Sequence, residues 1–307
     1  ILNIPYLFTD EEVAIEFMRG EMGKKMSEKL SEDTGISIAF YCPAGFRNTY
    51  NNVRPIHKPE DMVGIKMRTM SDKYIIAAFE ALGASAVSVP YSELYTALSQ
   101  SLVDGADNPF LNIYNSKHNE VATYLSETRN VFSVANLCVA DVAYDALPDE
   151  WKQLFDETCV ECLDIGCNTA IDKSAIEARE FLVANMKFNT LTDEEYDAFR
   201  EATSSVWDMA KSDLGEEYWN QVMQEIFKGN AKKMILILTD MITMVFCVIM
   251  IFPMIDVIEH LARLHSATLI LRLPMDLIYW VLPFALALQA FRFVQDIIRI
   301  IRAPAHE

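Results

Sequence analysis

A 25-residue apolar run near the C-terminus sets the strongest limit on how this chain can fold. The run "MILILTDMITMVFCVIMIFPMIDVI", from Met234 to Ile258, contains only two charged side chains, Asp240 and Asp256. About 20 predominantly apolar residues are enough for a helix to cross the hydrocarbon core of a bilayer. We therefore expect this segment to be a membrane-spanning helix.

A second apolar run, "LIYWVLPFALALQAF", spans Leu277–Phe291 and reaches the required length when Met275 and Phe293–Val294 are included. Tyr279 and Trp280 near its start suit a membrane interface. Basic side chains follow its end, at Arg292, Arg299 and Arg302. The alternative is a buried hairpin in a soluble domain, which explains these flanking residues less well. Residues 234–294 are therefore expected to form two helices in a lipid bilayer.

Charge divides the chain at the same place. Residues 1–227 hold 18 lysines and arginines against 38 aspartates and glutamates, a net charge of −20, whereas residues 228–307 hold 8 against 6, a net charge of +2. We expect two domains of different physical type, residues 1–227 and residues 228–307. The acidity of the first disfavours binding to the phosphate backbone, so no nucleic-acid partner is expected.

The first domain has the pattern of an α/β fold, because short strand-like runs alternate with helical ones. Helices are expected over Glu11–Leu30, after a cap at Ser92 as far as Ser101, from Pro148 to Asn185, and after a capping box of Thr192 and Glu195. Strands are expected over Ile36–Tyr41, Lys66–Arg68 and Ser85–Val89, with a turn at Pro43-Ala44-Gly45. Such alternation predicts a mostly parallel sheet, with a ligand site at the carboxyl ends of its strands.

Arg68 lies at one of these strand ends, in "GIKMRTM". A guanidinium group fits a carboxylate through two charge-assisted hydrogen bonds, a geometry that lysine cannot reproduce. From the residues alone, a surface arginine paired with a nearby acid is an equal alternative.

The remaining reactive side chains indicate no enzyme, metal site or cofactor. Cys159 and Cys162 form a C-x-x-C, but they sit in an acidic helical run without the βαβ context of a redox motif, so we interpret them as helix thiols. The five histidines have neither metal-ligand nor triad spacing, and no chemistry is assigned to them. They are His57, His118, His260, His265 and His306.

Ordered motifs between residues 54 and 128 are similar to a known pattern. They are "PEDMVGIKMR" at 59–68, "GA" at 83–84, "ELYTAL" at 93–98 and "DGADNP" at 104–109. Together they strongly resemble the solute-binding subunit of TRAP transporters, and the resemblance covers roughly Ile1 to Ile226. The stretch "RLPMDLIYWVLPFALAL" loosely resembles the second half of the small membrane subunit of the same transporters.

The resemblance implies a two-lobed periplasmic-binding-protein fold followed by a transmembrane hairpin. It implies that residues 1–227 lie outside the cytoplasm, in the periplasm, and that the hairpin lies in the inner membrane. The implied function is capture of an organic acid, by closure of two lobes, for a cation-driven secondary transporter whose partners are the large and small TRAP membrane subunits. A dicarboxylate, an oxo acid or a sugar acid fits equally. The alternative is the sensor ectodomain of a membrane receptor, although no output segment follows Ile298.

The resemblance also assigns individual residues. Arg68 matches the arginine that pairs with the ligand carboxylate, and Asn108 matches a ligand-facing asparagine, although Asn also suits a turn before proline. Tyr91 matches an aromatic position that packs on the ligand. The alternative is that Tyr91 packs in the protein core. Arg47 matches a second arginine near the ligand, with a structural ion pair as the alternative.

The sequence departs from the family pattern in two ways. The family begins with a signal peptide and an opening β/α segment, neither of which is found before Ile1, so we expect a truncated start. The small subunit has four membrane helices, whereas two are expected here. Basic residues outside both ends of the hairpin favour the cytoplasm for each end, which would also place residues 1–227 there. We therefore expect the two parts to act as separate chains rather than as one working polypeptide.

Overall fold

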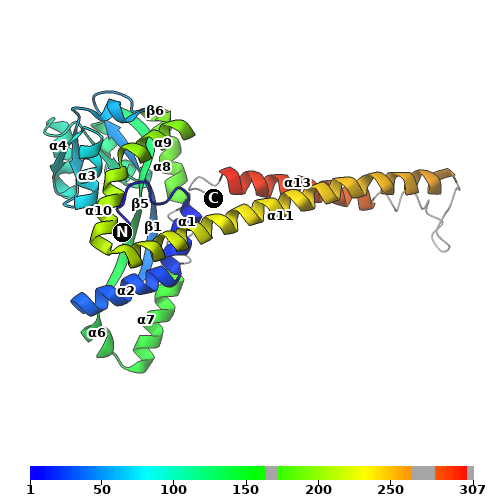
Figure 1. The fold of residues 1–307 in the computed structure, drawn as a ribbon, viewed down its shortest axis with the longest axis horizontal. Helices are drawn as coiled ribbons and strands as arrows, with labels where there is room; N and C mark the ends of the chain where they lie inside the picture. The colour runs from blue at the N-terminus through cyan, green and yellow to red at the C-terminus, as the bar shows by residue number, and fades with distance from the viewer. Residues whose placement is uncertain (164–171, 264–280, 303–307) are drawn as a thin grey trace. The chain divides into compact units, whose positions relative to one another are not determined.

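A computed structural model describes residues 1–163, 172–263 and 281–302 of the chain (Figure 1). The chain divides into two compact units, Ile1–Ile226 and Phe227–Pro304. The first unit is α/β, and the second consists of helix among its described residues.

The sheet of the first unit has six described strands in the order β3-β2-β4-β1-β5-β6. The strands are β1 (Ile36–Asn51), β2 (Lys66–Thr69), β3 (Ser85–Ser88), β4 (Gly105–Asn108), β5 (Tyr124–Ala140) and β6 (Lys187–Thr190). The pairs β2–β3, β2–β4 and β5–β6 are parallel, whereas β1 pairs antiparallel with β4 and β5. The prediction of a mostly parallel sheet is therefore wrong for the two long strands, whose pairing forms the centre of the sheet.

The turn predicted at Pro43-Ala44-Gly45 is also wrong, because β1 continues through it. Pro43 pairs with Val134 and Gly45 with Ser133, which leaves Ala44 as an extra residue in a register shift. A bulge of this kind absorbs one residue without ending the strand. Pairing with β5 on both sides of the bulge therefore outweighs the local preference for a turn.

The described helices of the first unit lie on both sides of this sheet (Figure 1). They are α1 (Glu11–Arg19), α2 (Glu21–Thr34), α3 (Lys73–Ala81), α4 (Leu94–Ser99), α5 (Phe110–Asn115), α6 (Asp141–Asp145), α7 (Asp149–Glu161), α8 (Asp172–Asn185), α9 (Asp193–Ala202) and α10 (Ser204–Leu214). Short 3-10 turns lie at Pro59–Met62, Tyr91–Glu93 and His118–Glu120.

Several helices of the first unit begin directly after a residue whose side chain caps the helix. The capping box of Thr192 and Glu195 is confirmed, with the Glu195 amide donating to Thr192 Oγ1 at 3.3 Å and the Thr192 amide to Glu195 Oε2 at 2.8 Å. Asp10 caps α1 as a single N-cap residue, whose side chain accepts from two backbone amides.

Two helix predictions need correction, and a third is tested only in part. The helix expected over Glu11–Leu30 is two helices, because Gly20 has extended backbone between α1 and α2. Ser92 lies inside a 3-10 turn, and α4 begins after Glu93 without a side-chain cap. The long helix expected from Pro148 to Asn185 is described only in part, by α7 and α8, because residues 164–171 lie outside the described residues.

Three hydrophobic clusters hold the first unit together. One packs α1 and α2 against the first half of β1 and against α10, the second packs α4, α5 and α8 around the end of β1, and the third packs α3 and α9 under β2. Each fully buried large aliphatic or aromatic side chain contributes about 1.5–3 kcal/mol. The second and third clusters lie under the strands that carry the site described below.

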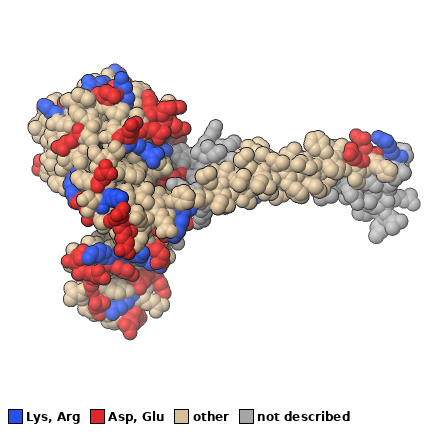
Figure 2. All heavy atoms as spheres, viewed as in Figure 1, with Lys and Arg blue, Asp and Glu red and all other residues tan. Residues whose placement is uncertain are grey.

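The second unit contains one described helix that is long and apolar enough to cross a membrane. Helix α11 (Glu216–Arg263) begins in the first unit, and its segment Ile237–His260 has a mean hydropathy of 2.5. Helix α13 (Val281–Arg302) covers part of the second predicted span, whose start lies outside the described residues. Large apolar side chains of α11 are exposed, and Figure 2 shows little charge along this segment. Such a surface suits lipid rather than water.

We expect the two parts to differ in their need for detergent. A chain ending at Phe227 should be monodisperse in buffer, because its large apolar side chains pack mostly in the three clusters. Residues 228–307 should require detergent or lipid. Size-exclusion chromatography with and without detergent measures both. Recovery of residues 228–307 as a soluble monomer would contradict the membrane assignment.

Candidate functional site

Side chains of β2 alternate between the two faces of the sheet, and this alternation places Arg68 in the site. Ile65 and Met67 point into the apolar cluster under the strand, and each is at most 1% exposed, whereas Lys66 and Arg68 point the other way. Arg68 is nevertheless only 3% exposed. Its Nε donates to the Val89 carbonyl at 2.8 Å, and its other guanidinium N–H groups have no hydrogen bond to the described residues.

The charge of Arg68 has no acidic partner in ion-pair contact within the described part of the chain. Burial lowers its pKa, and the nearby positive charge of Arg47 lowers it further. A buried cation without a counter-charge is costly, and a bound anion offsets that cost. The exposed part of the guanidinium is therefore suited to receive a carboxylate.

Arg47, by contrast, is already neutralised by the protein. Its Nε donates to Asp107 Oδ2 at 2.8 Å and one terminal nitrogen donates to Oδ1 at 2.9 Å and to the Asp107 carbonyl. Asn130 Nδ2 donates to the same carboxylate at 2.8 Å. Burial alone would raise the pKa of Asp107, but Arg47 reverses the effect and holds that pKa below its usual value. The structure thus contains the ion pair that the sequence left open for Arg47.

Asn108 is the first member of a buried hydrogen-bonded chain. Its Nδ2 donates to Tyr50 Oη at 2.9 Å, and Tyr50 Oη lies 2.8 Å from His118 Nδ1. The rings of Tyr50 and His118 are stacked, with centroids 5.6 Å apart. All three side chains are at most 2% exposed. This chain of hydrogen bonds fixes the orientation of the Asn108 amide.

Tyr91 forms the open side of the site and is 42% exposed. Its ring lies under the Arg68 guanidinium, 5.7 Å from centroid to carbon, and meets the His118 ring edge-on at 5.8 Å. Its hydroxyl is 2.7 Å from Ser116 Oγ. Tyr91 is therefore a partly exposed platform next to Arg68 rather than a core residue.

The four predicted residues come together because β2, β4 and β1 are neighbours in the sheet. Arg68 is on β2, Asn108 on β4 and Arg47 on β1, and the register pairs Asn48 with Asn108. Tyr91 reaches the group from the 3-10 turn after β3. Whether they contact a ligand remains a prediction.

Three further residues of the site were missed by the sequence analysis. Asp107 stands beside Asn108 in the "DGADNP" motif, which could have drawn attention to it. Tyr50 lies in a strand-like alternation and His118 lies in a loop. No motif or residue spacing in the sequence marks either of them as part of a site. His118, to which no chemistry was assigned, contacts two residues of the site.

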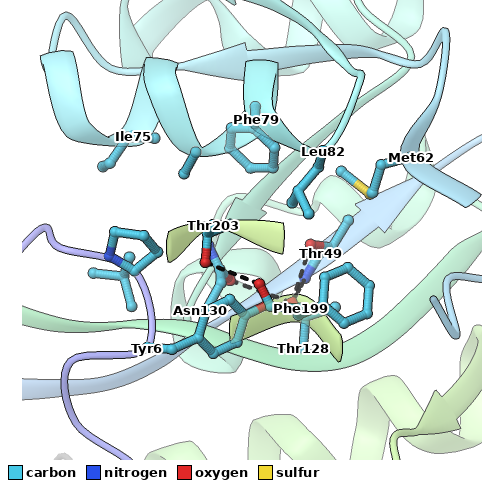
Figure 3. A pocket seen from close by; sticks show the side chains of 13 residues that line it. Tyr6, Thr49, Met62, Ile75, Phe79, Leu82, Thr128, Asn130, Phe199 and Thr203 are labelled. Atoms are coloured by element: carbon cyan, nitrogen blue, oxygen red, sulfur yellow. Dashed lines mark hydrogen bonds between the residues drawn. The ribbon is translucent and has the colours of Figure 1, made fainter. Parts of the chain in front are cut away.

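A small cavity of about 20 Å³ is lined by residues that include Thr49, Thr128 and Asn130 (Figure 3). Ile75, Phe79 and Leu82 lie on one side of the cavity, while the other side carries hydroxyl and amide groups next to Phe199 (Figure 3). Thr49 Oγ1 lies 3.0 Å from Thr128 Oγ1, which donates to Asn130 Oδ1 at 3.2 Å. Because Asn130 Nδ2 also donates to Asp107, this polar chain extends to the Arg47–Asp107 ion pair.

The described residues contain no group of three or more metal-ligating side chains. Cys42 is disulfide-bonded, whereas Cys159 and Cys162 have free thiols.

We expect His118 to make the folded protein less stable in acid. Burial, and secondarily the charge of Arg68, lowers the pKa of His118 to about 4 from an ordinary value of about 6.5. Between these values the unfolded chain takes up a proton that the folded protein does not, so the free energy of unfolding falls as the pH falls. The loss between pH 7 and pH 4 should be about 2 kcal/mol, a figure reduced for screening by solvent.

Urea unfolding of the wild type and of His118→Phe at several pH values measures this effect. The free energy of unfolding of the wild type should rise relative to that of His118→Phe as the pH rises from 4 to 7. Parallel curves would show that His118 binds a proton equally well in both states.

Two family models match consecutive parts of the chain. The model described as bacterial extracellular solute-binding protein, family 7, matches residues 1–213. The model described as the DctQ component of tripartite ATP-independent periplasmic transporters matches residues 221–303. The resemblance drawn from the motifs is confirmed for both parts.

Curated relatives agree with the first match. The chain is 30% identical over 219 residues to the C4-dicarboxylate-binding periplasmic protein DctP of Rhodobacter capsulatus, covering 71% of this chain and 65% of that protein. It is 28% identical over 218 residues to the 2,3-diketo-L-gulonate-binding periplasmic protein YiaO of Escherichia coli, covering 70% and 65%. The chain thus spans less than two thirds of the length of these relatives.

Solved structures confirm the two-lobed α/β fold. The sugar acid binding protein DctPAm of Advenella mimigardefordensis, in complex with galactonate, is 30% identical with a TM-score of 0.70, over 74% of this chain and 73% of that one. A TRAP periplasmic solute-binding protein of Sulfurospirillum deleyianum with bound succinate is 30% identical with a TM-score of 0.66, over 72% and 73%. Because the first family model covers more than half of the chain, this protein belongs to the bacterial extracellular solute-binding proteins of family 7, and it carries a DctQ-component segment in the same chain.

Proposed function

We propose that residues 1–227 capture an organic acid outside the cytoplasm and deliver it to a cation-driven TRAP secondary transporter. One observation carries the proposal. Arg68 is buried with guanidinium N–H groups that have no partner among the described residues, whereas the neighbouring Arg47 is fully paired with Asp107. The site therefore has one positive charge available for an anion, and the family is one of solute-binding proteins.

The ligand class follows from the same charge. The named relatives bind a C4-dicarboxylate or 2,3-diketo-L-gulonate, and the solved neighbours hold galactonate or succinate, which are all carboxylates or sugar acids. We assign the ligand carboxylate to Arg68, a polar group of the ligand to Asn108, and packing on the ligand to Tyr91. Arg47 acts through Asp107 by holding β1 and β4 in place.

The location and the partners are part of the proposal. A disulfide at Cys42 suits an oxidising compartment such as the periplasm. The DctQ-component match supports assembly of residues 228–307 with the other TRAP membrane subunits in the inner membrane. Because the charges around the hairpin favour the cytoplasm for both of its ends, we propose that the two parts work as separate chains.

The receptor alternative is not favoured, since both matched family models describe components of extracellular solute binding and transport. The family is likewise not one of enzymes. Recovery of a bound organic acid chemically unchanged after incubation would exclude turnover directly.

A thermal-shift screen of organic acids on the full-length protein tests the function, because a ligand that binds only the folded state raises the unfolding temperature. At least one acid should raise it at millimolar concentration, and the methyl ester of the same acid should not. A full screen of dicarboxylates, oxo acids and sugar acids without any shift would overturn the proposal.

A further inference from the structure

We infer that a pocket beside Arg129 is a second binding site, and that it takes a monocarboxylate with an aromatic or other flat apolar body. Arg129 lies on β5 and Arg68 on β2, with β4 and β1 between these strands in the sheet. Neighbouring strands are about 4.8 Å apart, so three steps across the sheet separate the two arginine backbones by roughly 14 Å or more. The pocket is therefore distinct from the Arg68 site, and the inference does not depend on the proposed function.

The pocket has a volume of about 250 Å³. Its walls come from the segment before α1, from the two long strands β1 and β5, and from α9. Four of its nine lining residues are aromatic, namely Tyr6, Phe8, Phe46 and Tyr196. Sites for drug-sized ligands are somewhat larger and are likewise lined mainly by apolar and aromatic side chains. The size and the walls therefore suit a small molecule with an apolar ring.

Arg129 gives the pocket its available positive charge. The guanidinium lies over the Phe46 ring, 4.4 Å from carbon to centroid, and one terminal nitrogen donates to the Thr9 carbonyl at 3.2 Å. Its other guanidinium N–H groups have no hydrogen bond to the described residues, and Arg129 forms no ion pair with them. A guanidinium that stacks on a ring through its face keeps its edges free, and such an edge fits a carboxylate through two N–H groups.

The backbone is strained at two residues of the pocket. Tyr6 has a φ of 54° and Arg129 a φ of 45°, in the left-handed region that residues other than glycine rarely adopt. Hydrogen bonds hold both residues there, from the Tyr6 amide to the Asn130 carbonyl at 2.8 Å and from the Arg129 amide to Asn48 Oδ1 at 3.2 Å. Strain of this kind is concentrated at ligand sites, where the surrounding structure imposes it. Here it places the Arg129 side chain over Phe46 at the pocket wall.

The charges on α9 limit the ligand to one carboxylate. Asp193, Asp197 and Arg200 line the pocket from this helix. Arg200 Nη1 lies 3.5 Å from Asp197 Oδ1, so the charges of these two side chains largely offset each other. Asp193 forms no ion pair with the described residues, and its carboxylate repels a second negative charge in the pocket. The arrangement therefore fits an apolar monocarboxylate and disfavours a dicarboxylate.

The test uses benzoate as the probe. Benzamide is its neutral counterpart, acetate lacks the ring, and phthalate carries a second carboxylate. Calorimetry at neutral pH measures the affinities on the full-length wild type, Arg129→Gln, Arg129→Lys, Asp193→Asn and Arg68→Lys. Lys152→Gln is the matched control, because it removes a cation that also lies over an aromatic ring, that of Tyr144, at 5.8 Å. Thermal unfolding without ligand shows that each variant is folded.

Benzoate should bind the wild type at millimolar concentration or below, and the three other compounds at least about 10-fold more weakly. Arg129→Gln should weaken benzoate about 10-fold or more, whereas Arg129→Lys, which keeps the charge but not the planar fork, should weaken it about 3-fold. Asp193→Asn should narrow the difference between phthalate and benzoate, and it tests the same pocket if Arg129→Gln does not fold. Lys152→Gln should change the affinity for benzoate by less than about twofold.

Four results would overturn the inference. They are no binding of benzoate to the wild type at millimolar concentration, phthalate binding as tight as that of benzoate, an unchanged affinity in Arg129→Gln, and an equal loss in Lys152→Gln. A loss in Arg68→Lys without one in Arg129→Gln would assign benzoate to the Arg68 site, and it would leave the proposed function intact.

Discussion

Replacing Arg68 by lysine is expected to weaken organic-acid binding by about 1.5–3 kcal/mol, or roughly 10- to 150-fold. Lysine keeps the charge but has no planar pair of N–H groups for a carboxylate, and it cannot make the same bond as Nε does to the Val89 carbonyl. Calorimetry on the full-length protein with the best acid of the screen measures the change.

The matched control is Arg200→Lys, because Arg200 is 43% exposed at its side chain and pairs only at the surface with Asp197. This variant should bind as the wild type does. Unfolding temperatures without ligand should be nearly equal for all three proteins. An affinity of Arg68→Lys equal to that of the wild type would remove Arg68 from the binding site.

Replacing Asp107 by asparagine is expected to lower the free energy of unfolding by about 3–5 kcal/mol. The change leaves Arg47 buried without its counter-charge, at a place where both partners are at most 5% exposed. Asn130 also loses its charged acceptor. Equilibrium unfolding in urea, with the midpoint and the slope fitted separately, measures the loss.

Two controls distinguish the cost of leaving a buried charge unpaired from the cost of losing a carboxylate in general. Asp213→Asn removes a partly exposed partner of Lys73 and of the Tyr74 hydroxyl, and it should lower the free energy of unfolding much less than Asp107→Asn does. The double change Arg47→Met with Asp107→Leu should cost less than Asp107→Asn alone, since it leaves no unpaired charge. A loss below about 1 kcal/mol for Asp107→Asn would show that water or another group neutralises Arg47.

Several features of this protein could be predicted from local sequence because their causes are local. The run Met234–Ile258 is long and apolar enough to span a bilayer whatever surrounds it, and α11 contains it. Thr192 and Glu195 cap a helix because the two groups are three residues apart. The motif ending in Arg68 identifies both the strand and the family.

Other features depend on residues that are distant in the chain. The antiparallel pairing of β1 with β5 joins segments about ninety residues apart and carries β1 through a sequence that resembles a turn. The split of one expected helix at Gly20 depends on how α1 and α2 pack on β1. Local propensity is a weak guide where tertiary contacts decide the outcome.

The site shows the same division. Sequence alone determined that Arg68, Asn108, Tyr91 and Arg47 are the residues to examine, because each stands in a recognisable motif or matches a family position. Only the tertiary structure decided that Arg47 is neutralised by Asp107 while Arg68 has no such partner. It also placed His118, 68 residues after Tyr50, against that ring. The physical reason is that charge compensation and hydrogen-bond direction depend on distances in space, which spacing along the chain does not contain.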